Sequence, residues 1–255
     1  MSLTSAVLRF AAPVPHLTDF SRFLFVGPHP DDIELGAGAS AAALADKGKQ
    51  ITFLVCTDGR YGLENAVPGT TPEELAQIRE QESIAGAAAL GVGDVRFLRL
   101  SDGAAYKTEA LLCGIARVIG EVQPEVIFAP DPFVPAECHP DHLNVGKAVR
   151  TLAFFAPFRE IMAGYGAESA DVQAVAWYMT ARPNRYIKTG STFSKQQSAI
   201  RCHVSQFPAG SDALRSLTTY LKLRSVDFGL RSLYGRAEGF RVLGKTQMHC
   251  LPEAK

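Results

Sequence analysis

Residues 23–34 read FLFVGPHPDDIE, and this stretch decides the fold. Phe23 to Val26 form a short apolar run of the kind buried in a parallel sheet, and Gly27-Pro28 ends it. A pattern of small residues from about Leu35 to Lys47 follows and predicts a helix, with Gly48 as its stop signal. A strand that leads through a short polar loop into a helix is the unit from which α/β folds are built.

The same alternation continues along the chain. The segment 71–74, TPEE, has the form of a capping box with proline at the first helical position, and predicts a helix that ends near Leu90. Short apolar runs and helical patterns predict further strands over 51–56, 95–100, 125–129 and 174–179, and helices over 108–120 and after His142. We therefore predict an α/β fold, Rossmann-like and doubly wound, whose mainly parallel sheet carries helices on both faces.

The last part of the chain contains helical patterns over 192–203 and 212–224. We expect these helices to pack onto the main domain rather than to form a separate one. A chain of 255 residues suits a single domain over 1–255. Within it we expect a Rossmann-like core over about 20–180 and a C-terminal elaboration over about 181–255.

The charge balance argues against a nucleic-acid partner. Acidic and basic residues number 26 each, whereas a phosphate-binding surface usually shows as a basic excess. A local basic patch remains open for Arg224, Arg231, Arg236 and Arg241, although nearby apolar residues favour a solvated helix face. No window approaches the ~18 uninterrupted apolar residues of a membrane span, so we expect no membrane partner.

The cysteines predict a reducing compartment. Their number is odd, their spacings are wide and no CxxC occurs; they are Cys56, Cys113, Cys138, Cys202 and Cys250. This pattern argues against a disulfide scaffold and against a cysteine-based zinc site. We expect a cytoplasmic protein.

A first polar motif, His29-Pro30-Asp31-Asp32, follows the first predicted strand. Pro28 and Pro30 restrict the backbone on both sides of His29, and a stiff loop suits a metal ligand. Of two adjacent carboxylates, one can bind a metal while the other takes a proton from water. The alternative is that Asp31 or Asp32 only caps the following helix.

A second motif, His139-Pro140-Asp141-His142, follows the fourth predicted strand. Histidines three residues apart at the start of a helix can face in one direction. The alternative is that Asp141 caps this helix while both histidines are exposed. The fourth strand is expected to lie beside the first, where strand order reverses, and ligands bind at the carboxyl ends of the strands there. The two motifs can thus share one site.

Two imidazoles and one carboxylate, from His29, His142 and Asp32, would make an open three-ligand zinc site with room for water. The same ligand types also hold iron(II). Hydrolysis is favoured because two groups are left over. Asp31 is placed to act as a general base, and His139 to stabilise an oxyanion or to protonate a leaving amine.

The two motifs, HPDDIELGAG over 29–38 and HPDH over 139–142, resemble those of the PIG-L family, the LmbE-like N-acetylglucosaminyl deacetylases. Weaker similarities extend over most of the chain, in TDGRYG (57–62), REQE (79–82) with AAALG (87–91), LSDG (100–103), AIRCHVSQ (199–206) and YGRAEGF (234–240). The resemblance implies a zinc-dependent amidohydrolase that removes an acyl group, usually acetyl, from an N-acylated amino sugar or glycoconjugate.

The resemblance also implies roles for particular residues. One Zn²⁺ per chain, or Fe²⁺ or another divalent metal in its place, would be held by His29, Asp32 and His142. Asp31 would be the general base. His139 would stabilise the tetrahedral intermediate, and Asp141 would orient His139. Arg79 and Asp102 would contact the substrate or orient the ligands. Trimers or hexamers are implied by family analogy.

Several alternatives remain open at this level. The position before the second motif is often acidic in relatives, whereas here it is Cys138, with Glu137 one residue earlier. Arg79 could form only a helix-surface ion pair with Glu82, Asp102 could be only a turn residue, and His203 could be a packed helix histidine. At the level of function, a non-catalytic sugar- or nucleotide-binding module and a metal hydrolase of another amide bond are the competing hypotheses.

Overall fold

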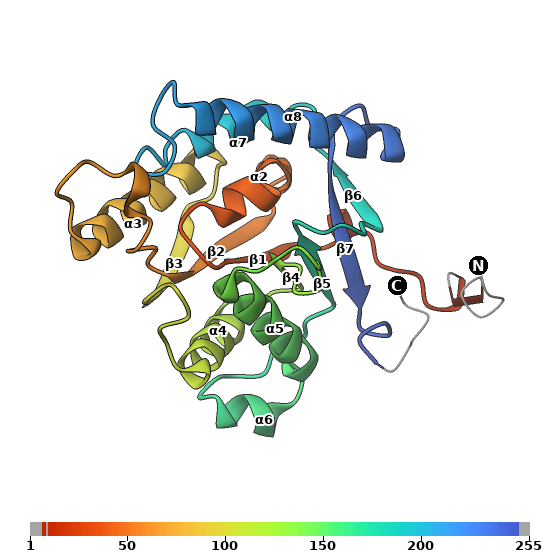
Figure 1. Ribbon diagram of the computed structural model, residues 1–255. Coiled ribbons are helices and arrows are strands. Elements are labelled where there is room, and N and C mark those ends of the chain that lie inside the picture. Colours follow the sequence, from red (N-terminus) through yellow and green to blue (C-terminus); the bar gives the residue numbers. More distant parts are fainter. Residues whose placement is uncertain (1–6, 9, 250–255) are drawn as a thin grey trace.

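The computed structural model describes residues 7, 8 and 10–249; Cys250 lies outside them. Seven strands form one sheet in the order β3-β2-β1-β4-β5-β7-β6 (Figure 1). Their bounds are β1 Arg22–Gly27, β2 Gln50–Thr57, β3 Asp94–Leu100, β4 Val126–Pro130, β5 Ala174–Tyr178, β6 Arg185–Lys188 and β7 Ala237–Gly244. Strands β1 to β5 pair in parallel, and β7 pairs antiparallel with both β5 and β6. The predicted mainly parallel α/β fold is confirmed.

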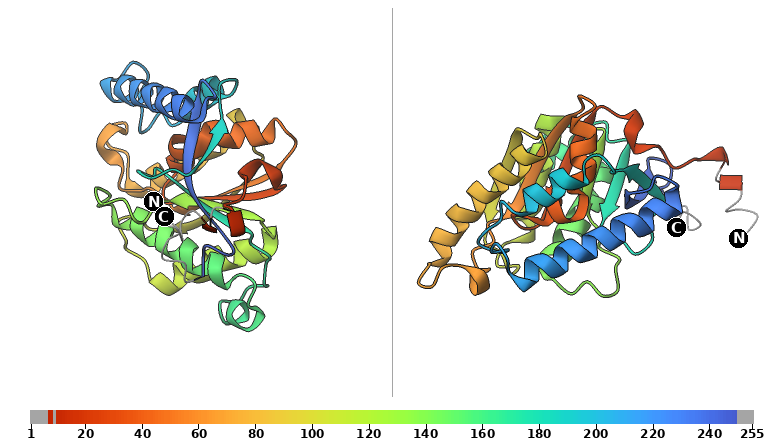
Figure 2. Two further views of the ribbon diagram at one scale, coloured as in Figure 1. Left: turned by 90° about the vertical axis from the view of Figure 1, so that its right-hand side faces the viewer. Right: turned by 90° about the horizontal axis from the view of Figure 1, so that it is seen from above.

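The helices lie on both faces of this sheet (Figures 1 and 2). Their bounds are α2 Asp32–Ala45, α3 Pro72–Ala89, α4 Thr108–Val122, α5 Pro140–Phe155, α6 Arg159–Gly164, α7 Phe193–Ile200 and α8 Asp212–Ser232, with short 3-10 turns at Leu17–Asp19 and Leu63–Asn65. Helices α2, α3 and α7 contribute to the core on one face, and α4, α5 and α6 to the core on the other.

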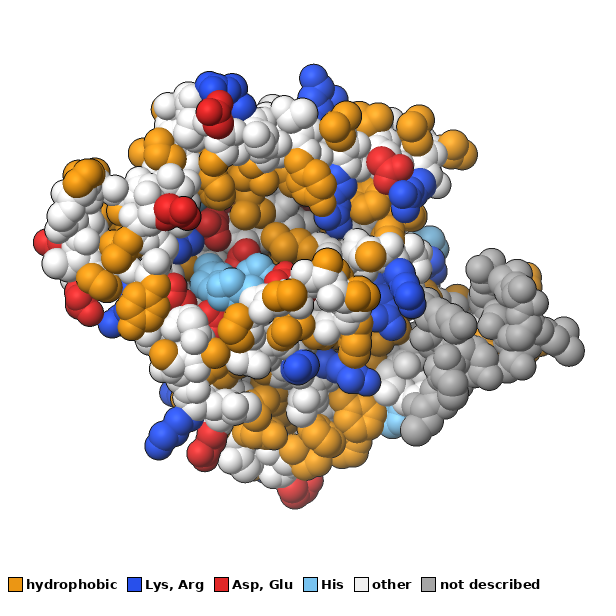
Figure 3. Space-filling model, in the orientation of Figure 1, with side chains coloured by type: hydrophobic (Ala, Val, Ile, Leu, Met, Phe, Trp, Pro, Cys, Tyr) orange, Lys and Arg blue, Asp and Glu red, His pale blue; other side chains and the backbone are white. Residues whose placement is uncertain are grey.

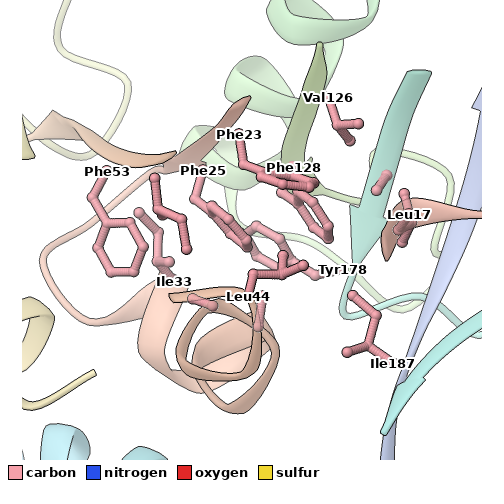
Figure 4. Packing of buried hydrophobic residues seen from close by; sticks show 14 of the residues in the cluster. Leu17, Phe23, Phe25, Ile33, Leu44, Phe53, Val126, Phe128, Tyr178 and Ile187 are labelled. Atoms are coloured by element: carbon pink, nitrogen blue, oxygen red, sulfur yellow. The ribbon is translucent and has the colours of Figure 1, made fainter. Parts of the chain in front are cut away.

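Strand β1 shows why both faces are covered. Phe23 and Phe25 point into one core while Leu24 and Val26 point into the other, because successive side chains of a strand face opposite ways. Phe25 stacks on Phe128 of β4 with ring centroids 4.2 Å apart (Figure 4). A strand buried on both faces reads as the continuous apolar run seen in the sequence.

The C-terminal part differs most from the prediction. Helix α8 was expected to end at Arg224 but continues to Ser232, and the strands β6 and β7 and the helix α6 were not predicted. The interpretation of the arginine-rich tail as one helix face is wrong for Arg236, which follows the end of α8, and for Arg241, which lies in strand β7. This strand is hard to read because Glu238, Gly239 and Arg241 interrupt its apolar pattern.

No helix within the described residues is both long and apolar enough to cross a bilayer. The four cysteines in the described part of the chain are free thiols.

Candidate active site

The two polar motifs meet at the carboxyl edge of the sheet, because β1 and β4 are parallel neighbours. The first motif joins β1 to α2, and the second opens α5 after β4. The imidazole of His29 lies 4.6 Å from that of His139 and 5.3 Å from that of His142, centroid to centroid. Histidine side chains gather at one place on the surface, with acidic side chains around them (Figure 3).

One oxygen of Asp32 lies between two of these histidines. Its Oδ2 is 3.0 Å from Nδ1 of His29 and 3.3 Å from Nε2 of His142. Tetrahedral zinc with bonds of about 2.0–2.1 Å holds its ligand atoms roughly 3.3 Å apart. The spacing between Oδ2 of Asp32 and each of the two imidazole nitrogens therefore suits ligands of one metal ion.

The remaining nitrogens of the same two histidines face other carboxylates. Nε2 of His29 is 3.1 Å from Oδ2 of Asp141, and Nδ1 of His142 is 2.9 Å from Oε2 of Glu137. Metal-binding histidines usually donate their second N–H to a carboxylate, which fixes the ring and its tautomer. The arrangement leaves Nδ1 of His29 and Nε2 of His142 to point at the proposed metal position.

A second group of side chains, the three histidines, is also close enough together to bind one metal ion. His29, His139 and His142 each offer a ring nitrogen within 4.8 Å of the others. His139 differs from the other two because its Nδ1 accepts a hydrogen bond, at 3.3 Å, from the backbone N–H of Asp141. The neutral ring then carries its proton on Nε2, where it can be donated. Burial lowers the pKa of His139, and the neighbouring His29 and His142 lower it further, which favours this neutral form.

The carboxylates favour positive charge at the ligand positions. Burial alone would lower the pKa of His29, but hydrogen bonds to Asp141 and Asp32 raise it to about 10. Burial alone would also lower the pKa of His142, but Asp32 and Glu137 raise it to about 9. Burial would raise the pKa of Asp32, yet the two histidines hold it well below its usual range. A cation is stabilised at this point of the protein.

Asp31 lies beside the ligand set in an unusual backbone conformation, with φ 142° and ψ −25°. Its side chain makes no capping hydrogen bond to α2, so the capping alternative is wrong for this residue. Oδ2 of Asp31 instead lies 3.1 Å from the guanidinium of Arg79. Burial raises the pKa of Asp31 to about 6 against the opposing charge of Arg79. A strained, buried carboxylate of this kind is typical of functional sites.

Arg79 is buried in α3 and holds the loops around Asp31. Its guanidinium donates to the carbonyls of Gly59 and Pro30, both at 3.0 Å, as well as to Asp31. The alternative of a helix-surface ion pair with Glu82 is wrong, because Glu82 accepts instead from the backbone N–H and hydroxyl of Ser205.

Asp141 and Asp102 are held by backbone N–H groups. The carboxylate of Asp141 accepts from the backbone N–H groups of Gly103 and Ala104, both at 2.8 Å, and the N-cap of α5 is His139. Asp141 is therefore not the helix cap. Asp102 is buried; its Oδ2 accepts from the backbone N–H of Tyr61 at 3.3 Å, while Oδ1 has no partner among the described residues.

Glu137 was not predicted as a site residue, and His203 was left open between a site residue and a packed histidine. Glu137 lies 2.9 Å from His142. The sequence signal for it was that an acidic residue stands one position before Cys138, where an acidic residue is often found. His203 is fully buried, with Nε2 3.3 Å from Oε1 of Glu34 in α2, and it follows α7 rather than lying in it. The HxSQ similarity was the only sequence signal for His203.

The family model described as "PIG-L: GlcNAc-PI de-N-acetylase" matches residues 24–153, which include both motifs. The chain belongs to the PIG-L family. One similar PIG-L protein is the diacetylchitobiose deacetylase of Thermococcus kodakarensis, 31% identical over 92% of this chain and 88% of that protein. Another relative is a 1D-myo-inositol 2-acetamido-2-deoxy-alpha-D-glucopyranoside deacetylase of Kineococcus radiotolerans, 30% identical over 69% of this chain and 56% of its own length.

The solved structure of the N,N'-diacetylchitobiose deacetylase from Pyrococcus horikoshii matches this PIG-L chain with a TM-score of 0.87 and 26% identity, over 99% of this chain and 97% of that one. The 4-carboxy-2-hydroxymuconate hydratase GalB of Pseudomonas putida shares the fold, with a TM-score of 0.73 at 22% identity over 88% of this chain and 96% of its own. The fold alone thus does not define the reaction, and the site residues must carry that argument.

Proposed function

We propose that the protein is a zinc-dependent amidohydrolase that removes an N-acetyl group from an amino sugar or glycoconjugate, with His29, Asp32 and His142 as the metal ligands. The observation that carries the proposal is the position of Asp32 between two histidines whose outer nitrogens both face carboxylates. The diacetylchitobiose and inositol-glycoside relatives are both named as deacetylases, which supports the same bond as the target here.

A bound zinc ion would supply Lewis-acid chemistry, polarising the amide carbonyl and making water more acidic. Asp31 would accept the proton from water as the general base. Its carboxylate is held by Arg79 beside the ligands, and its pKa of about 6 lies near the pH at which a base must work.

His139 would stabilise the developing negative charge on the amide oxygen. Its neutral ring carries a donor at Nε2 because Nδ1 is occupied by the N–H of Asp141. Asp141 is fully buried and fixed by two backbone N–H groups, so it would keep both His29 and His139 in place. Of the remaining predicted residues, Arg79 would orient Asp31, and Asp102 would position the loop after β2 beside the site through its hydrogen bond from the backbone N–H of Tyr61.

We also propose a cytoplasmic location and a homo-oligomeric state. The free thiols of the described cysteines suit a reducing compartment. A trimer or hexamer rests on family analogy alone, and the mass of the purified protein in solution tests it.

The test combines metal content with turnover. Zinc-loaded protein should hold about one zinc per chain and release acetate from N-acetylglucosamine or diacetylchitobiose. Asp31→Asn keeps the shape of the side chain and tolerates a positive φ, so it should keep its zinc while losing at least about 100-fold in kcat. Asp19→Asn, on an exposed turn, is the matched control and should stay fully active.

Two results would contradict the proposal. Full activity of Asp31→Asn would remove the general base from the mechanism. No acetate from any N-acetyl amino sugar, with zinc bound, would refute the deacetylase function itself.

A further inference from the structure

A cavity of about 260 Å³ lies between α2, α8 and the start of β7. Helix α8 crosses the molecule above α2 and reaches β7 (Figures 1 and 2). The walls that matter here are apolar and come from α2, α8 and the residue after β5; they are Leu35, Met179, Leu217, Leu221 and Phe228. None of these residues belongs to the predicted metal or catalytic set.

The cavity and the candidate active site lie at the same edge of the sheet. Leu35 lies in the first turn of α2, and its backbone N–H donates to the carbonyl of Asp31 at 3.0 Å. Met179 follows the last residue of β5, and the carboxyl end of β5 lies at the same edge of the sheet as those of β1 and β4. Hydrophobic side chains lie between the histidines and the helix that crosses the top of the molecule, α8 (Figure 3).

The buried carboxylate in the cavity wall already has its partners. Glu238 accepts from the backbone N–H groups of Ala39 and Ser40, at 3.2 and 2.7 Å, and from Nε2 of Gln196 at 2.9 Å. Three donors occupy most of the acceptor capacity of one carboxylate. Glu238 therefore holds α2, α7 and β7 together, and few of its acceptor positions are left for a ligand.

The positively charged side chain in the cavity wall, Arg224, also has partners already. Arg224 donates to the hydroxyl of Tyr220 at 2.8 Å and to the carbonyl of Thr180 at 3.2 Å, and its guanidinium lies 5.0 Å from the centroid of the Phe228 ring. A sugar ring would need several free polar groups that converge on it, as polar ligands do. The surface left for a ligand is mainly leucine, methionine and phenylalanine, which suits a hydrocarbon chain.

We propose that this cavity receives the acyl chain of the substrate, so that the enzyme prefers N-acyl groups longer than acetyl. The inference rests on the proposed amidohydrolase function and extends its substrates from N-acetyl amino sugars to those that carry short or medium alkyl chains. A cavity of ~150 Å³ can hold benzene, so the space here suits a chain of about six to eight carbons. In the reaction water adds to the carbonyl carbon, the C–N bond breaks, and the products are a fatty acid and the free amine.

The experiment compares N-acetyl-, N-butyryl-, N-hexanoyl- and N-octanoylglucosamine with the zinc-loaded protein. All four release glucosamine, so one amine assay serves the series. Because a buried methylene contributes about 0.8 kcal/mol, kcat/KM should rise about fourfold per methylene until the cavity is filled. The ratio of kcat/KM for two substrates does not depend on how much of a preparation is active.

A pair of substitutions on α8 locates the chain. Leu217→Trp adds bulk to a half-buried wall residue, and it should lower the hexanoyl-to-acetyl ratio at least tenfold. Leu223→Trp makes the same change on the same helix, at a side chain that is 66% exposed and outside the cavity, and should leave the ratio unchanged. If Leu217→Trp fails to fold, Leu217→Phe gives the same comparison with less added volume.

The outcomes separate the two proposals. Hydrolysis of the acetyl compound without a gain for longer chains overturns the cavity assignment and leaves the deacetylase function standing. If kcat/KM rises with chain length but Leu217→Trp does not reduce that rise, the cavity assignment is also overturned, because the acyl chain then binds elsewhere. No hydrolysis of any member refutes the proposed function, and the cavity assignment falls with it.

Discussion

Glu137 supports the second motif from the loop after β4. The residue directly before that motif is Cys138, whose side chain is exposed. The loop after β4 instead brings Glu137 to Nδ1 of His142 at 2.9 Å, and the same carboxylate accepts from the backbone N–H of His139 at 2.7 Å. Both bonds fix the start of α5.

Glu137→Gln should weaken zinc binding about tenfold, because the carboxylate that supports a metal-binding histidine raises its basicity. Competition with a chelating dye measures the change in Kd. Glu109→Gln, on the exposed first turn of α4, serves as the control and should bind zinc as the original protein does. An unchanged Kd for zinc in Glu137→Gln would show that Glu137 does not support metal binding.

Gly86 marks the closest approach of α3 to the buried pair of Glu34 and His203. A Cβ at this position would lie 2.7 Å from Oε1 of Glu34 and 2.9 Å from Nε2 of His203. Gly86→Ala should therefore destabilise the protein by about 1–3 kcal/mol, although alanine usually stabilises a helix. Gly164→Ala, at the end of α6 with nothing within 4 Å of its Cβ, is the control and should not destabilise. Urea unfolding distinguishes the two, and equal stability would contradict the packing argument.

The residue types of the site could be predicted from two short motifs, but their contacts could not. The sequence leaves open whether Asp31 and Asp141 cap helices, because a carboxylate before a helix has the same appearance in either role. The structure removes that ambiguity through Arg79 and through the backbone N–H groups of Gly103 and Ala104. These partners are distant in sequence, and no local pattern reveals them.

Among the elements, those with a local signal were predicted well. The capping box at Thr71 is present, and α3 begins at Pro72 and ends at Ala89, within one residue of the expected end. Strand β1 differs from its prediction by one residue at each end. Strand β7 was missed because its order depends on pairing with β5 and β6, and Glu238 in it faces the mid-helix amides of α2. Tertiary contacts outweigh propensity there.

Glu238 makes the stability of this element depend on pH. Burial raises its pKa to about 7 in the folded protein, although hydrogen bonds from Ser40 and Ala39 oppose the shift. The folded state thus binds the proton more tightly than the unfolded state. Its contribution is complete at low pH and is lost as pH rises from the unfolded pKa of about 4.5 through about 7, at a cost of at most about 3 kcal/mol.

Glu238→Gln should remove this loss, so that the decline in free energy of unfolding between pH 5 and pH 8 becomes smaller than in the original protein. Urea unfolding at the two pH values measures it. The comparison of slopes is unaffected by any constant cost of the substitution. A decline of the same size in both proteins would show that Glu238 is not the titrating group.

At the scale of the whole molecule, the site joins two motifs that lie more than 100 residues apart. The sequence predicts their meeting because both follow parallel strands, and ligand sites of open α/β sheets lie where strand order reverses. A metal held by His29, Asp32 and His142 would therefore connect the β1–α2 loop to the start of α5. Such a connection exists only in the folded chain.

Zinc should accordingly stabilise the fold. At a free concentration about 1,000 times the Kd, binding contributes about 4 kcal/mol, which corresponds to a rise in Tm of roughly 8–16 °C for a chain of this size. Asp32→Asn should lose most of that rise, whereas Asp31→Asn should keep it. Thermal unfolding with and without zinc measures both, and the reverse order of the two variants would exchange their assigned roles.

Strand β7 also has a consequence for how the protein is made. Strand β5 ends at Tyr178, but its antiparallel partner begins only at Ala237, roughly 60 residues later. At about 5–20 residues per second on the ribosome, the outer edge of β5 stays unpaired for roughly 3–12 seconds. During that interval the nascent chain exposes the unpaired backbone groups of β5, next to Trp177, to any other strand nearby. A chain truncated between these two strands would keep that edge unpaired and would be prone to aggregate.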